Sequence, residues 1–294
     1  MRTPTLVALA VPVIAAAALT GCGGDADAAG TVRLAVTDLQ GLEELQREFG
    51  AFETELERAS GLPVEFFPVT DRVAAAGALA GDQVDLVFTG PAEYVVLNER
   101  TDAAPLIAIR RPDYHSCLYT AAGSGITDTD QLRGQKIAMS DVGSTSGHLG
   151  PSQLLVDAGI DPQEDLEVLT VGDAQHQALV RGDVAAVGTG CHDYEEFTAD
   201  EPNAAVAFPL LVEGPPLPPD VVLYRDGLDP AVVETMRTAF EENFPTLLAA
   251  MLQGKDNAKY EGAELVAVDD GDYDVVRDMY RAIGVEDTTE FVGG

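Results

Sequence analysis

The apolar positions in the first third of the chain follow two alternating patterns. Short, mostly apolar runs predict buried strands, and an apolar stripe with spacings of three and four predicts an amphipathic helix from Leu42 to Leu56. The expected strands and helices are Val32–Val36, Leu42–Leu56, Val64–Val69, Asp71–Leu79, Val84–Phe88 and a helix that starts at Pro91. Strands that alternate with helices in this order predict βαβ units on a mostly parallel sheet.

The same alternation of strand and helix patterns starts again in the middle of the chain. The expected elements there are Lys136–Met139, Gly147–Ala158, Glu167–Thr170, Ala174–Arg181 and Val184–Val187. Residues 78–84 and 178–184 have a similar Ala-Leu to Gly-Asp pattern, and each leads into a strand that ends in Thr-Gly. We therefore expect an α/β protein with two lobes, each a mostly parallel sheet flanked by helices. Ligands bind beyond the carboxyl ends of such strands, so the two lobes predict a cleft between them.

The proline-rich run Pro215–Pro219 is the clearest interruption of this pattern, because it suits neither a helix nor a central strand. We interpret it as the second crossing between lobes, with the first near Cys117–Ala122. Residues 31–117 and 220–294 would then form lobe 1, and residues 118–219 lobe 2 with the hinge crossings. The remaining elements, Val221–Tyr224, Pro230–Leu252 with a break near Pro245, and Tyr273–Ile283, are expected to return to lobe 1.

The N-terminal residues predict export. Arg2 precedes an apolar stretch from Leu6 to Leu19, which is typical of a signal peptide and short for a membrane span. Leu19-Thr20-Gly21-Cys22 resembles a bacterial lipobox, in which the cysteine becomes the lipidated first residue. We therefore expect a lipoprotein signal peptide at residues 1–21, lipidation of Cys22, a flexible tether at residues 22–30, and a location in the cell envelope outside the cytoplasm.

Charge and residue usage exclude several classes of partner. The formal net charge of −33 disfavours nucleic acid and anionic lipid headgroups, so the lipid anchor is the expected contact with the membrane. The four histidines lack the spacing of a helical metal pair, and we expect no metal, no cofactor and a monomer. Cys117 and Cys191 can form a disulfide in an exported protein or remain as buried thiols, and the sequence leaves both open.

The segment Asp141–Pro151 contains the most informative chemistry. Ser144, Thr145 and Ser146 lie beside glycines between a predicted strand and a predicted helix. Free backbone N–H groups and the helix dipole favour an anion at such a turn, and the hydroxyls add donors suited to an oxyanion. A plain N-cap is the alternative. The segment lacks the lysine of a phosphate-binding P-loop, and Thr145 replaces the central serine of a nucleophile elbow.

Asp141–Pro151, with its Ser-Thr-Ser-Gly core, resembles the loop of the phosphonate, phosphite and phosphate binding proteins of ABC importers, the PhnD-like family. The segments around Asp71, Gly90-Pro91, Tyr114 and Pro215–Pro219 resemble the family in the same order, and the similarity spans about Val32 to Ile283. The resemblance implies a type II periplasmic-binding-protein fold. It implies a substrate-binding protein that delivers a small phosphorus oxyanion to permease and ATPase subunits and is not an enzyme.

The resemblance also implies a set of ligand-binding residues. Matched positions in the first lobe and the crossings are Thr89, Tyr94, Tyr114, Asp220 and Arg72, the last standing where the family has an aromatic residue. Matched positions in the second lobe are Ser144, Thr145, Ser146, Gly147, His176 with a small shift, and His192. The choice among phosphonate, phosphite and phosphate stays open. An exported enzyme acting on phosphoesters and the ligand-binding subunit of a sensor system are the alternative functions.

Overall fold

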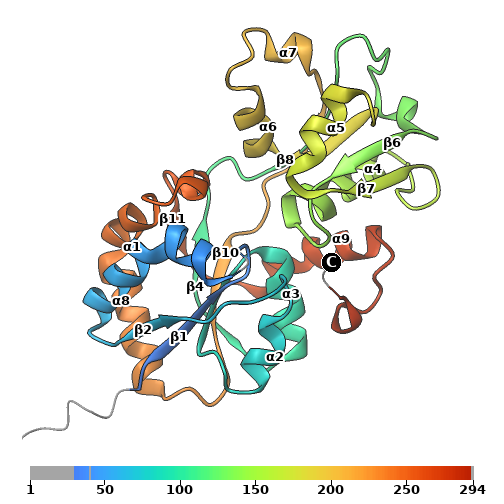
Figure 1. Cartoon of the computed structure of the whole chain (residues 1–294). Helices are drawn as coiled ribbons and strands as arrows, with labels where there is room; N and C mark the ends of the chain where they lie inside the picture. Colours follow the sequence, from blue (N-terminus) through green and yellow to red (C-terminus); the bar gives the residue numbers. More distant parts are fainter. Residues whose placement is uncertain (1–29, 40, 293–294) are drawn as a thin grey trace, which may run out of the picture. The chain divides into compact units, whose positions relative to one another are not determined.

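The computed structural model describes residues 30–39 and 41–292 (Figure 1). The expected signal peptide, the lipidation site Cys22 and most of the tether lie outside the described residues. Within the described part, no helix combines the length and the hydropathy that crossing a bilayer requires.

The first sheet has six strands among the described residues, in the order β11-β4-β10-β3-β1-β2. They are β1 (Val32–Val36), β2 (Val64–Phe66), β3 (Leu86–Thr89), β4 (Ala104–Arg110), β10 (Asp220–Tyr224) and β11 (Glu264–Val266). β1 pairs in parallel with β2 and β3, as the alternating pattern predicts. β10 and β11 return from later in the chain and pair antiparallel with β3 and β4.

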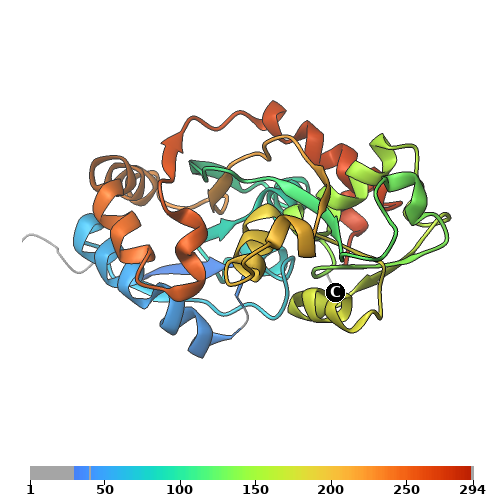
Figure 2. The same ribbon diagram turned by 90° about the horizontal axis from the view of Figure 1, so that it is seen from above.

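Helices cover both faces of the first sheet. They are α1 (Leu42–Ser60), α2 (Ala75–Ala80), α3 (Pro91–Arg100), α8 (Pro230–Met251) and α9 (Asp274–Ala282). The predicted stripe of α1 is buried at Leu45, Phe49, Phe52 and Leu56, where it packs with α8 in one apolar cluster. Figure 2 shows α1 in blue beside α8 in orange. A second cluster joins α2, α3 and α9 on the opposite face.

The second sheet has five strands within the described ranges, in the order β7-β6-β8-β5-β9. They are β5 (Ser116–Thr120), β6 (Lys136–Met139), β7 (Glu167–Thr170), β8 (Ala186–Gly190) and β9 (Leu210–Glu213). The accompanying helices are α4 (Gly150–Asp157), α5 (Gln175–Arg181), α6 (Cys191–Thr198) and α7 (Ala204–Ala207). The shorter helical turns of the whole described chain are η1 (Thr129–Leu132), η2 (Thr145–Leu149), η3 (Gly172–Ala174), η4 (Lys255–Tyr260), η5 (Asp270–Tyr273) and η6 (Thr288–Glu290).

Two extended segments, residues 111–115 and 214–219, join the sheets and lie side by side (Figure 1). Leu217 donates its N–H to the carbonyl oxygen of Tyr114 at 2.9 Å, and Nδ1 of His115 lies 2.8 Å from the carbonyl oxygen of Gly214. The proline run thus lies in a crossing, as expected. The expectation of a crossing near Cys117–Ala122 was wrong, because β5 occupies most of that range and pairs with β8 and β9.

Three other details differ from the sequence pattern. α2 begins at Ala75, because residues 71–74 form turns rather than the predicted start of a helix. α8 continues through Pro245 without a break. Pro245 and the upstream Glu241 are both exposed, so water can satisfy the carbonyl that loses its helical partner. Cys117 and Cys191 form a disulfide, which ties β5 to the first residue of α6.

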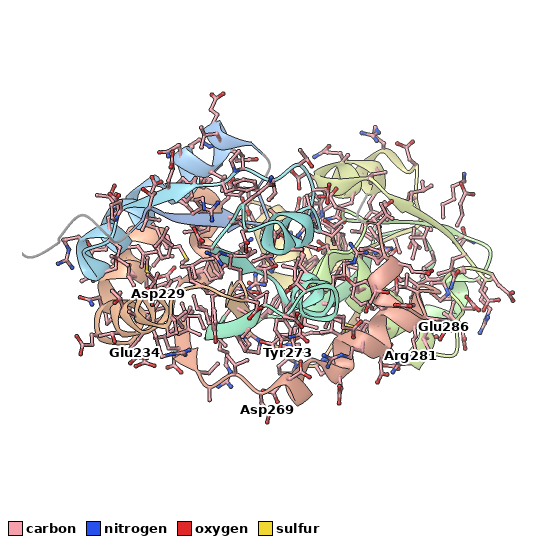
Figure 3. All side chains as sticks on the ribbon, turned by 90° about the horizontal axis from the view of Figure 1, so that it is seen from below. Asp229, Glu234, Asp269, Tyr273, Arg281 and Glu286 are labelled. Carbon is pink, nitrogen blue, oxygen red and sulfur yellow. A yellow bond between two sulfur atoms is a disulfide. The ribbon has the colours of Figure 1, made fainter. Side chains whose placement is uncertain are left out.

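The C-terminal segment contacts α4 of the second sheet as well as α3 of the first. The prediction had returned it to lobe 1 alone. Figure 3 follows this segment from Asp269 past Tyr273 to Arg281 and Glu286, where it lies along the green ribbon. Residues of α9 and of the turn after α4 line a groove of about 490 Å³, which contains none of the predicted ligand-binding residues.

Candidate functional site

The hydroxyl loop, residues 144–146, follows β6 and opens a helix. The Oγ atom of Ser144 accepts a hydrogen bond from the N–H of Gly147 at 3.3 Å, which makes Ser144 an N-cap. A π-helical turn, η2, then leads directly into α4. A Cβ atom on Gly147 would lie 2.4 Å from Cβ of Ser140, so the tight return of the chain requires glycine here. The N-cap interpretation therefore applies to Ser144, whose hydroxyl caps the helix. The hydroxyls of Thr145 and Ser146 remain for other partners, as the anion-binding interpretation requires.

His148 supports the hydroxyl loop through a hydrogen bond to the backbone that precedes it. It is buried, and its Nδ1 accepts a hydrogen bond from the N–H of Gly143 at 3.2 Å. Burial lowers the pKa of His148 to about 4. The ring is therefore neutral at physiological pH, and its proton lies on Nε2. The loop thus presents hydroxyls and backbone N–H groups without a charged side chain of its own.

The N-terminus of α3 faces this loop from the first sheet. The N–H of Ala92 donates a hydrogen bond to Oγ1 of Thr145 at 3.0 Å. Beside it, the buried hydroxyls of Thr37 and Thr89 lie 2.9 Å apart. A Cβ atom on Gly90 would lie 2.9 Å from Oε2 of Glu93 and 3.8 Å from Oγ1 of Thr145. Glycine at position 90 thus keeps open the small space where polar groups of both lobes converge.

Arg72 lies at the centre of an ion-pair network on the first-lobe wall. Its Nη1 is 2.5 Å from Oδ1 of Asp38 and 2.8 Å from Oε1 of Glu93, and its Nη2 is 3.9 Å from Asp141 of the opposite lobe. Lys259 and, to a smaller extent, Arg72 hold the pKa of Asp38 well below its usual range. Burial raises the pKa of Glu93, and the negative charge of Asp38 adds to that effect. Asp38 therefore carries the firmly ionised carboxylate of the pair.

Arg111 and Asp220 form a second, fully buried ion pair at the crossing. Nε of Arg111 lies 3.0 Å from Oδ2 of Asp220, and Nη2 donates to Oδ1 at 3.2 Å. The Arg111 guanidinium also lies 3.5 Å from the centre of the Tyr114 ring, within the range of a cation–π interaction. Asp220 and Tyr114, two of the positions that the resemblance implies, are thus both in contact with Arg111.

Lys259 of η4 completes the charged wall. Its Nζ lies 2.8 Å from Oδ2 of Asp38 and 5.7 Å from the ring centre of the neighbouring Tyr260. A network from the second lobe faces it: His192 Nε2 lies 3.1 Å from Asp193 Oδ1, and the hydroxyl of Thr189 donates to Asp193 Oδ2 at 3.1 Å. The His192 ring lies 6.4 Å from that of Tyr114.

The structure does not bring two predicted residues into this cluster. The hydroxyl of Tyr94 donates to Asp270 at 2.9 Å, and its ring packs 4.2 Å from Tyr273 in the core of the first lobe. Nδ1 of His176 lies 2.5 Å from the hydroxyl of Tyr119, and its ring stacks on Phe197. Both side chains therefore have structural partners outside the group of residues around Thr145, Arg72 and Arg111.

Sequence reasoning missed the charged partners Asp38, Glu93, Arg111 and Lys259. Glu93 and Arg111 lie within or beside segments that had been recognised, around Gly90 and Tyr114, so their position was a usable signal. No recognised segment lies near Lys259 in the sequence, because a short turn late in the chain brings it to Asp38. Among the described residues, no group of three or more His, Cys, Asp and Glu side chains is arranged to hold a metal ion.

Comparisons with known proteins agree with this architecture. The family model for the periplasmic substrate-binding protein of phosphonate ABC transporters matches residues 34–276. The phosphate-import protein PhnD of Mycolicibacterium smegmatis is 24% identical over 283 aligned residues, which cover 87% of each chain.

Solved structures share the fold. PhnD1 of Prochlorococcus marinus in complex with methylphosphonate superposes with a TM-score of 0.69 at 16% identity, covering 87% of this chain and 98% of that one. A binding-protein component of a phosphonate ABC transporter from Pseudomonas aeruginosa gives a TM-score of 0.65 at 18% identity, covering 85% of each chain. These likenesses confirm the type II periplasmic-binding-protein fold. Together with the family match they identify the chain as a member of the family of phosphonate-type periplasmic substrate-binding proteins of ABC transporters.

Proposed function

We propose that this chain captures a small phosphorus oxyanion, namely a phosphonate, phosphite or phosphate, between the hydroxyl loop and the N-terminus of α3. The observation that carries the proposal is the hydrogen bond from the N–H of Ala92 to Oγ1 of Thr145, which joins the two helix starts across the cleft. Both helix starts favour negative charge. The relatives named above, one importing phosphate and one holding methylphosphonate, support this ligand class.

Capture proceeds by movement about the two crossing segments. An incoming oxyanion takes the donors of Thr145, Ser146 and the α3 start, and so it replaces a lobe-to-lobe hydrogen bond with bonds that it makes to both lobes. A ligand shifts the balance between open and closed forms only through its higher affinity for one of them. The closed, loaded form then delivers the ligand to the permease and ATPase subunits of the importer.

A thermal-shift panel tests the ligand class. Phosphate, phosphite, methylphosphonate, sulfate and methanesulfonate are each added to the purified protein. At a concentration of 100 times Kd, a true ligand adds about 2.7 kcal/mol, which corresponds to roughly 5–10 °C in Tm. We expect such a shift with at least one phosphorus oxyanion. No shift with any of them, or a larger shift with sulfate or methanesulfonate, would contradict the proposal.

We propose further that the chain binds without catalysis. A phosphoester hydrolase needs a base positioned against its nucleophile. His148, adjacent in sequence to the hydroxyl loop, instead directs Nδ1 to the N–H of Gly143. Purified protein should leave p-nitrophenyl phosphate intact. Hydrolysis that is lost in the Ser146→Ala variant would favour the enzyme instead.

The mature protein is, in this proposal, a monomer anchored through a lipid on Cys22. In cells, the wild type should fractionate with membranes, and the Cys22→Ala variant should not carry the lipid when its mass is measured. Deletion of the gene should reduce the uptake of the phosphate or phosphonate that the purified protein binds. Such a loss would favour transport over a purely sensory role.

A further inference from the structure

Lys259 contributes a positively charged ammonium group to the first-lobe wall. It lies in η4, next to Tyr260, and keeps 22% of its side-chain surface exposed. Its Nζ is bound to Oδ2 of Asp38 at 2.8 Å. Asp38 also binds Arg72, so the lysine and the arginine share one carboxylate at the end of β1. Lys259 is therefore held in place by the wall itself and does not need a ligand to fix its position.

The charge of Lys259 acts on carboxylates of both lobes. It is the largest cause of the lowered pKa of Asp38. Burial raises the pKa of Asp193, but His192 and, to a smaller extent, Lys259 outweigh it and lower the pKa. Burial raises the pKa of Asp220, and the charges of Arg111 and Lys259 oppose that rise. The positive charge of Lys259 therefore favours the ionised form of all three carboxylates, and its direct contact is with Asp38.

Each of these carboxylates already has a partner in the protein. Asp38 pairs with Arg72 and Lys259, Asp220 with Arg111, and Asp193 with His192. With its phosphonate group on the hydroxyl loop, an amine-bearing phosphonate would direct a second ammonium group away from Ser144–Ser146, toward the first-lobe wall, where it would require a carboxylate of its own. It would meet the like charge of Lys259 instead, and like charges brought together in a partly buried cleft repel one another.

We infer that Lys259 is a specificity-determining residue that excludes ligands with a cationic amine and restricts the cleft to small amine-free oxyanions such as phosphate, phosphite and methylphosphonate. The inference rests on the proposed function, because it concerns the end of the ligand that points away from Ser144–Ser146. Removal of the lysine leaves Oδ2 of Asp38 without its lysine partner and available to a ligand ammonium, and should convert rejection into acceptance.

Isothermal titration calorimetry with phosphate, phosphite, methylphosphonate and 2-aminoethylphosphonate tests this inference. For the wild type, we expect 2-aminoethylphosphonate to bind at least 100-fold more weakly than the best amine-free ligand. Lys259→Met should reduce the ratio of these two dissociation constants at least tenfold, because it strengthens binding of 2-aminoethylphosphonate and weakens binding of the amine-free ligands. Lys259→Arg keeps the charge and should keep the rejection. Lys255→Met, an exposed lysine of the same turn, is the matched control and should leave the ratio unchanged.

The outcomes separate this inference from the proposed function. Wild type that binds 2-aminoethylphosphonate as tightly as methylphosphonate overturns the inference alone, as does Lys259→Met that weakens all ligands by the same factor. Absence of binding by any of the four probes overturns the proposed function as well. If Lys259→Met fails to fold, Lys259→Gln replaces it, because glutamine removes the charge but can still donate a hydrogen bond to Asp38, and it should reduce the ratio of dissociation constants in the same way.

Discussion

The two walls of the cleft differ in their chemistry. The first-lobe wall contains the ion pairs of Asp38, Arg72, Glu93 and Lys259, and the buried pair of Arg111 with Asp220. Opposite them, the second lobe contributes the hydroxyl loop, whose supporting residue His148 is buried and neutral, and the carboxylate of Asp193 beside His192. The first-lobe wall therefore contains charges that neutralise one another, whereas the hydroxyl loop provides neutral donors.

This difference assigns a separate task to each wall. Charges paired within the protein hold side chains in fixed positions, and breaking such a pair leaves a charge without compensation. Neutral hydroxyls exchange one acceptor or donor for another with little change in free energy. In the proposed function, the charged wall fixes the geometry and selects the ligand, and the hydroxyl loop releases the N–H of Ala92 and binds the oxyanion. This arrangement also reconciles anion binding with a chain of net charge −33.

The largest effect is expected when the buried ion pair of the charged wall is broken. Asp220→Ala leaves the Arg111 guanidinium buried without its partner and should lower the free energy of unfolding by about 3–5 kcal/mol. The double variant Arg111→Met with Asp220→Leu removes both charges and should recover most of the loss. Urea denaturation measures both. The exposed pair Lys136–Glu167 is the control, and Glu167→Ala there should change stability by less than about 1 kcal/mol.

A somewhat smaller effect is expected from the disulfide that joins β5 to the start of α6. Cys117 and Cys191 are 74 residues apart, and Cys191 directly precedes His192. The double variant Cys117→Ala with Cys191→Ala should lower the free energy of unfolding by about 2–4 kcal/mol. A reductant should lower the Tm of the wild type to that of the double variant and leave the variant unchanged. Equal melting of both proteins without reductant would contradict a structural role.

The pH dependence of stability tests whether His148, which supports the hydroxyl loop, is buried in its neutral form. The pKa of His148 is about 4 in the folded protein and about 6.5 for an unburied histidine. Between these values the unfolded chain binds the proton and the folded chain does not, so stability is lost as the pH falls from 6.5 toward 4. The full loss from this group is about 3 kcal/mol. His148→Asn retains an acceptor for Gly143 and should remove this part of the pH dependence, which the difference between the two unfolding curves measures. An unchanged difference from pH 7 to pH 4 would show that His148 is not buried in the neutral form.

The smallest effect on stability, with a larger one on binding, is expected at Gly147. The added methyl group of Gly147→Ala would meet Cβ of Ser140 at 2.4 Å, and such overpacking typically costs about 1–3 kcal/mol. It also shifts the hydroxyl loop, so affinity for phosphate or methylphosphonate should fall at least tenfold. Gly77→Ala in α2 is the control, since no atom beyond the neighbouring backbone of its own helix lies within 4 Å of the added carbon. It should preserve binding, and equal binding by both variants would place the ligand elsewhere.

Local sequence patterns predicted the parts of this molecule that depend on local structure. The stripe of α1 and the Ser-Thr-Ser-Gly loop were recognised because spacing and glycine positions alone define them. β5 was interpreted as a crossing, because its pairing with β8 and β9 depends on strands far away in the chain. Lys259 reaches Asp38 over a separation of 221 residues, which no local pattern encodes. The partners Asp38, Arg111 and Lys259 of the charged wall therefore required the structure, whereas Arg72, Asp220 and the hydroxyl loop lie in segments that the sequence alone marks.

The central claim is that the hydroxyl loop holds a phosphorus oxyanion. Isothermal titration calorimetry of the wild type and of Ser146→Ala with phosphate, phosphite and methylphosphonate tests it most directly. The claim predicts one site per chain for at least one of these ligands and a loss of affinity of at least tenfold in Ser146→Ala, with a melting temperature close to that of the wild type. Unchanged affinity in Ser146→Ala, or binding of none of the three ligands by the wild type, would contradict it.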